Sequence, residues 1–131
     1  MTKLLRWYLR LLAGLTIISC LGQLGLPAQV GAASAWGAAP GWQREIAFWD
    51  LGMYIVIVRT LRANDAIGGR TVAIALVVLQ LLVATNHGLA ATRGQAMLNA
   101  IMAGVNFACV VFGILALRSR ATGQDVGSRA A

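Results

Sequence analysis

The side chains best placed to do chemistry are an acid and amides that fall inside long apolar stretches. Asp50 lies in the run WDLGMYIVIV, where a charge near the bilayer centre costs roughly 2.5–3.5 kcal/mol. An ionisable residue in such a place is a candidate functional site that can hold a proton or a cation. Three amides, Gln23, Gln80 and Asn106, lie at similar depths in the other apolar stretches. We expect Asp50 to face the protein interior within reach of one of them.

A second polar group, formed by Glu45, Asn86, His87 and Asn99, is expected about 10 Å nearer the outer side. Helices that bury both groups would enclose a polar funnel open to the outside. Two simpler roles compete with a funnel. Glu45 would be an interfacial residue paired with a nearby arginine, and the amides would only join helices, at about 0.6 kcal/mol per hydrogen bond. Glu45 and Asp50 are also five residues apart, roughly 140° round a helix, so they need not face one space.

The last apolar stretch carries small residues at four-residue intervals: Ala96, Ala100, Gly104 and Ala108. Small residues at this spacing let the backbones of two membrane helices approach closely. We call this stripe the small-residue ridge. It is expected to pack against another helix, either in this chain or in a partner.

No motif assigns a reaction to this sequence. It contains no glycine-rich phosphate loop, nucleophile elbow, HExxH or CxxC motif, so no catalytic residue is predicted. A single histidine supplies too few ligands for a metal or a haem, and Cys20 and Cys109 are expected at other depths. The sequence therefore predicts neither a metal nor another cofactor.

Four apolar stretches must position these groups. The chain of 131 residues is 59% hydrophobic and 11% charged, whereas soluble domains are about 25% charged. Spans are expected at about 11–28, 42–61, 71–90 and 95–117, with a disordered tail over 119–131. The sequence therefore predicts an all-α integral membrane protein, a four-helix up-and-down bundle with one transmembrane domain over residues 1–131.

The basic residues predict how these spans are oriented. Nine of the eleven Lys and Arg residues fall on one side of the spans, which leaves Arg44 and Arg93 for the other side. The positive-inside rule then places both termini in the cytoplasm. The basic and then apolar start also fits a secretory signal, so cleavage is an alternative. We interpret the net charge of +7 as topology and attraction to anionic membrane lipid, not as nucleic-acid binding, because no continuous basic patch forms.

Three segments resemble small four-helix bacterial membrane proteins of the DoxX-like and BphX-like groups. They are the start LLRWYLRLLAG, the segment REIAFWDLGMYIVIVRTLRA after a long outer loop, and NHGLAATRG at the end of the third stretch. The resemblance implies an integral bundle in the bacterial inner membrane, in some cases beside redox or degradation enzymes. It carries over no catalytic residue.

Size, the small-residue ridge and the lack of catalytic motifs favour a non-enzymatic accessory or assembly subunit of a membrane complex. Such a subunit would act as a homo-oligomer or within a larger assembly. Two alternatives stay open. One is a small-solute or proton-coupled transporter that uses Asp50. The other is a redox or quinone-associated membrane component, which only the resemblance suggests.

Overall fold

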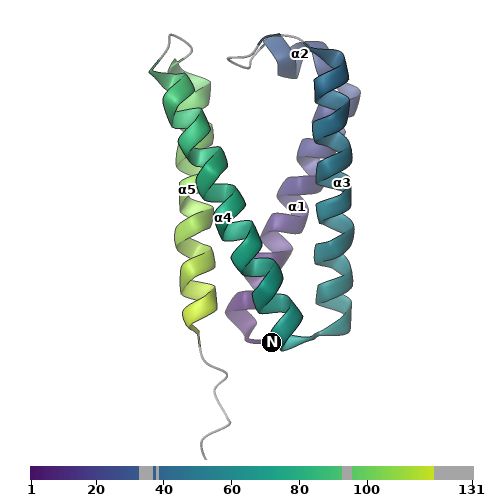
Figure 1. Cartoon of the computed structure of the whole chain (residues 1–131), viewed down its shortest axis with the longest axis vertical. Helices are drawn as coiled ribbons and strands as arrows, with labels where there is room; N and C mark the ends of the chain where they lie inside the picture. Colours follow the sequence, from purple (N-terminus) through teal and green to yellow (C-terminus); the bar gives the residue numbers. More distant parts are fainter. Residues whose placement is uncertain (33–36, 38, 93–95, 120–131) are drawn as a thin grey trace, which may run out of the picture.

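A computed structural model of the chain describes residues 1–32, 37, 39–92 and 96–119, apart from the side chain of Ala96. Within these residues the secondary structure is helical, as predicted. Four long helices and a short one follow in the order α1 (Lys3–Gly25), α2 (Pro27–Ala32), α3 (Pro40–Ala63), α4 (Ala66–Ala91) and α5 (Ala96–Arg118). The long helices run alternately up and down (Figure 1).

Local sequence signals set the helix ends. The Thr2 hydroxyl accepts a hydrogen bond from the third backbone amide after it, which starts α1, and Pro27 follows directly after the C-cap of this helix. Asn64 ends α3 in a left-handed conformation with φ of 51°. The Asp65 carboxylate then accepts from two amides and caps α4. The connection between α3 and α4 therefore needs only two residues.

The helix boundaries differ from the expected spans at the start of the chain. α1 begins at Lys3 and not near residue 11, because the Thr2 cap lets the helix include the basic residues ahead of the apolar run. The segment expected to connect the first two spans as an outer loop contains the short helix α2. The tail expected over 119–131 lies outside the described residues from residue 120 onward.

Among the helices described, three are long and apolar enough to cross a membrane. These segments are Lys3–Gly25, Ala66–Ala91 and Met97–Arg118, and they indicate a membrane protein. Helix α3 is not one of them, although its 24 residues reach about 36 Å. It differs from the other three in the charged residues along it, which are Arg44, Glu45, Asp50, Arg59 and Arg62.

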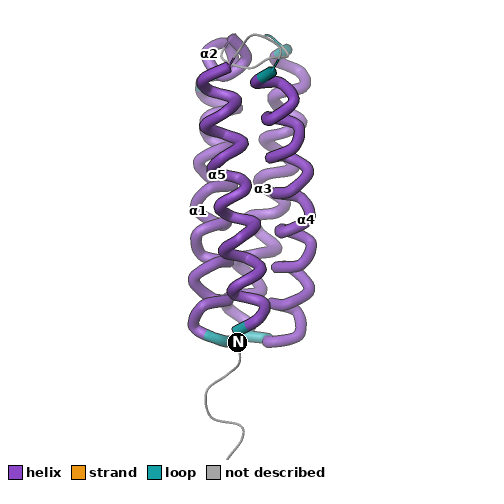
Figure 2. The backbone as a smooth tube through the Cα atoms, turned by 90° about the vertical axis from the view of Figure 1, so that its left-hand side faces the viewer, coloured by secondary structure: helices purple, strands orange, loops and turns teal. Residues whose placement is uncertain are grey.

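The long helices pack as two pairs, α1 with α3 and α4 with α5, and the pairs meet mainly at one end (Figure 1). Seen from the side, the long helices run nearly parallel (Figure 2). The buried core lies where the pairs meet, with Leu5, Tyr8, Leu9, Leu12, Ile57, Ala73, Leu76, Cys109 and Ala116 among its members. We call this the closed end. The pairs diverge toward the end that carries α2, which we call the open end.

Hydrogen bonds reinforce the closed end. They join Thr2 to Ser119 at 2.7 Å, Arg6 to Asn64 at 2.6 Å, and Arg70 to the carbonyl of Leu117 at 2.7 Å. The helix turns that meet there also carry most of the described basic residues, namely Lys3, Arg6, Arg59, Arg62, Arg70 and Arg118. The closed end is therefore both the packed end and the basic end of the molecule.

Candidate functional site

Toward the open end, one side of α3 forms a groove of about 510 Å³. We call it the α3 groove. Its lining combines one carboxylate with aromatic and apolar side chains: Glu45, Phe48, Trp49, Gly52, Met53 and Val56. Small-molecule sites typically measure 300–1,000 Å³ and have mostly apolar walls with a few polar groups. The α3 groove falls within this range of size, but all six of its lining residues belong to one helix, so it is an open face of α3 and not an enclosed pocket.

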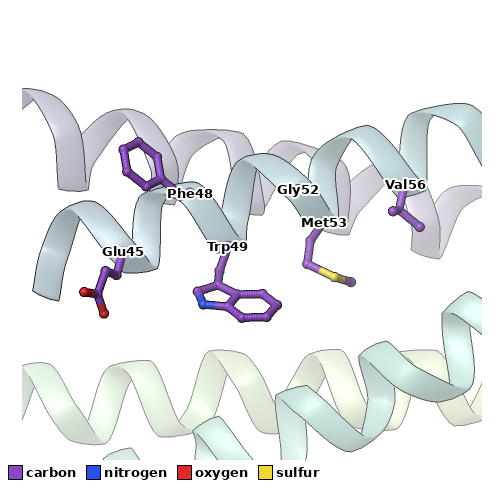
Figure 3. Close-up of a pocket in the computed structure, with 6 residues that line it drawn as sticks. All are labelled: Glu45, Phe48, Trp49, Gly52, Met53 and Val56. Carbon is purple, nitrogen blue, oxygen red and sulfur yellow. The ribbon is translucent and has the colours of Figure 1, made fainter.

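Helical periodicity brings the key groups of the groove together. Glu45, Trp49 and Met53 recur every four residues and share one face of α3. Figure 3 shows them directed toward the side on which α4 and α5 lie, whereas Phe48 points the other way. Trp49 is 77% exposed, so its indole ring is available to a ligand.

Asp50 faces α1 and not the α3 groove. Its carboxyl group hydrogen-bonds with the Ser19 side chain on α1. The second carboxylate oxygen, Oδ2, is buried and has no hydrogen-bond partner among the described residues. The two acids predicted for this helix therefore lie on different sides of it, as their spacing of roughly 140° allows.

The interface between α1 and α3 holds further unpartnered acceptors. Gln23 lies four residues after Ser19 on α1, and Gln43 lies seven residues before Asp50 on α3, so each shares a face with the Asp50 contact. Both amide oxygens are buried without a hydrogen-bond partner in the described part of the chain. Gln43 and Ser19 were not predicted as site residues, although helical spacing from Asp50 and Gln23 was a usable signal.

The remaining predicted polar residues belong to the other helix pair. His87 Nδ1 and Asn99 Oδ1 form a hydrogen bond of 2.9 Å that joins α4 to α5. Asn106 donates to the carbonyl of Met102 in its own helix at 2.7 Å. The Gln80 amide oxygen is buried and lacks a partner among the described residues. The contact that the structure gives for Asp50 is with Ser19 on α1, and pairing of Asp50 with Gln23, Gln80 or Asn106 stays a prediction. Depth alone does not determine which helices pair.

The small-residue ridge lies on an uncovered side of α5. Ala100, Gly104 and Ala108 are exposed. A Cβ atom built at Gly104 would have nothing within 4 Å beyond its own helix. The side chain of Ala96 lies outside the described residues. The ridge therefore packs against no other described helix of this chain, and its contact with a partner stays a prediction.

No protein-family model, curated protein or solved structure matches this chain. Within the described residues no group of three His, Cys, Asp or Glu side chains is close enough to hold a metal ion. The candidate sites are therefore the α3 groove, the Asp50 contact between α1 and α3, and the exposed ridge on α5.

Proposed function

We propose that the protein is a non-enzymatic accessory or assembly subunit of a membrane complex, which binds a transmembrane helix of its partner through the small-residue ridge. In this proposal all four long helices cross a bacterial inner membrane as an up-and-down bundle, with both termini in the cytoplasm. The carrying observation is that the ridge faces away from the bundle. Gly104 lies nine residues from Gly113, roughly 180° round α5, and Gly113 packs against Tyr8 of α1 and Val77 of α4.

The chemistry of the ridge favours a helix as its occupant. Helix association in a membrane depends on van der Waals packing, and small residues allow close approach of the backbones. Larger apolar side chains flank the exposed glycine, with Ile101 50% and Val105 44% exposed. The small residues thus form a shallow groove between larger side chains, and the side chains of a second helix fit into this groove.

The test is purification of the full chain from its native membrane in mild detergent, followed by mass spectrometry of the proteins that accompany it. Gly104→Leu should remove the partner, because the larger side chain holds the helices apart. Gly14→Leu is the matched control, since a Cβ at Gly14 of α1 also meets nothing within 4 Å. The same partner in both variants, or none with the native chain, would contradict the proposal.

A second candidate function is a proton-coupled or small-solute transporter centred on Asp50. The observation that favours it is the buried Oδ2 atom of Asp50, which has no described hydrogen-bond partner within a mostly apolar helix pair. Such a carboxylate is able to exchange a proton or a cation. Uptake of a solute by proteoliposomes, driven by a pH gradient and lost in Asp50→Asn, would support this function over that of a subunit.

A further inference from the structure

We propose that the α3 groove binds a lipophilic monovalent cation, with the Glu45 carboxylate as its counter-charge and the Trp49 indole as its aromatic contact. This inference is independent of the subunit function, because the groove and the small-residue ridge lie on different helices.

The charge of the groove selects a cation. Glu45 is the charged residue among the groove-lining side chains. Within the described residues, no hydrogen bond or ion pair engages its side chain. The halves of α4 and α5 toward the open end carry no Lys or Arg among the described residues, and His87 there is bonded to Asn99. Arg44 is next to Glu45 in sequence, which places it roughly 100° round the helix. Among the described residues, the groove therefore presents a negative charge that no hydrogen bond or ion pair engages.

The remaining lining selects a cation with apolar substituents. Trp49 follows Glu45 by four residues, a spacing that puts their Cβ atoms about 6 Å apart on one helix face. A cation held beside the carboxylate thus lies within reach of the indole ring, which attracts positive charge on its face. Met53 and Val56 continue the apolar lining, so bulky hydrocarbon groups on the cation gain van der Waals contacts there.

The same lining argues against an inorganic ion. Small hard cations such as Ca²⁺ need about six to eight oxygen ligands. Among the groove-lining side chains, the Glu45 carboxylate supplies the oxygen atoms. An anion would be repelled, and a neutral apolar molecule would gain nothing from the charge. A quaternary ammonium or phosphonium ion with aromatic or alkyl groups matches both the Glu45 carboxylate and the apolar and aromatic lining of the groove.

The test measures equilibrium binding of radiolabelled tetraphenylphosphonium to the full chain in lipid nanodiscs. We expect saturable binding that Glu45→Gln weakens by about tenfold or more and Trp49→Leu by about threefold or more. Two controls lie at the closed end. Trp7→Leu removes a tryptophan that is 61% exposed, and Asp65→Asn removes an acid while keeping its capping role. Both should stay within about twofold of the native affinity, since neither residue lines the groove.

A competition measurement on the unchanged chain does not depend on how the variants fold. Neutral triphenylphosphine oxide resembles the cation in shape, so it should compete at least about tenfold more weakly than unlabelled tetraphenylphosphonium. Equal competition by the neutral compound would overturn the proposal. So would the absence of saturable binding, or an unchanged affinity in Glu45→Gln with native helical content.

Discussion

The Tyr8 phenol of α1 lies directly against Gly113 of α5, and this contact joins the two helix pairs at the closed end. A Cβ atom at Gly113 would lie 2.7 Å from Tyr8 Cζ and 2.8 Å from Tyr8 Oη, and it would also clash with Val77 of α4. Tyr8 is fully buried, and its ring packs edge-on against Phe112 with centroids 5.7 Å apart. The lack of a side chain at Gly113 therefore allows three helices to meet.

Gly113→Ala should lower the free energy of unfolding by about 1–3 kcal/mol, because the added methyl group forces buried side chains to shift. Thermal unfolding in detergent, followed by circular dichroism, measures the loss. Gly104→Ala is the matched control on the same helix and should not destabilise the isolated chain; it should raise the free energy of unfolding by up to about 1 kcal/mol, because its site is open and alanine favours a helix more than glycine does. Equal effects of the two substitutions would show that the Tyr8 contact does not limit the packing.

The contrast between Gly104 and Gly113 shows what spacing predicts and what it leaves open. The four-residue repeat of small residues identifies a face of α5 that suits close packing. Which face another helix of the same chain covers depends on how the pairs associate, and no local pattern records this. Gly113 lies outside the repeat yet has the close neighbours, whereas Gly104 lies within it and has none.

Hydropathy predicted α1, α4 and α5 because their apolar runs are clear, whereas the charged residues along α3 leave it outside the candidate spans. Caps such as Thr2 determined where the helices begin. The positions of the polar residues along the helices could also be predicted, since depth follows from residue number at 1.5 Å per residue. Which residues meet across neighbouring helices could not be predicted from the sequence. Asp50 contacts Ser19, a residue type that in helices often bonds to its own backbone and therefore carries a weak signal for a neighbour.

The hydrogen bond between His87 and Asn99 should couple α4 to α5 measurably. Asn99 is only 2% exposed, so the bond is shielded from competing solvent. A double-mutant cycle with His87→Leu and Asn99→Leu should give a coupling energy of about 0.6 kcal/mol, the average for such bonds in membrane proteins, and at most about 1.7 kcal/mol. Unfolding in detergent provides the four stabilities. A coupling of zero would mean that the pair adds nothing to helix association.

The basic closed end should lie in the cytoplasm. Reporter fusions truncated after Asn64, and fusions after the last residue, should both give cytoplasmic signals, because the positive-inside rule keeps Lys and Arg on that side. A fusion truncated after Ala32, at the open end, should give a signal from the outside. If the fusion after Asn64 instead reports an external position, the orientation is reversed.

Substitution of Asp50 separates a structural acid from a transporting one. If the acid serves only to join α1 and α3, Asp50→Asn should change stability by less than about 0.5 kcal/mol, because an amide still bonds to Ser19. Asp50→Leu should lower the free energy of unfolding by about 1 kcal/mol, since the hydrogen bond is lost.

Ser19→Ala is the matched control for this contact. The variant that combines Asp50→Leu with Ser19→Ala should lower the free energy of unfolding no more than Asp50→Leu alone does. If Asp50 carries a proton or a cation, Asp50→Asn should abolish uptake in proteoliposomes at unchanged stability, because an amide cannot ionise. Full stability in both Asp50→Leu and Ser19→Ala would show that this contact does not hold α1 and α3 together. The buried Oδ2 of Asp50, which has no hydrogen-bond partner among the described residues, would then have no structural role in the pair. A loss of uptake in Asp50→Asn would be the result that assigns it a function.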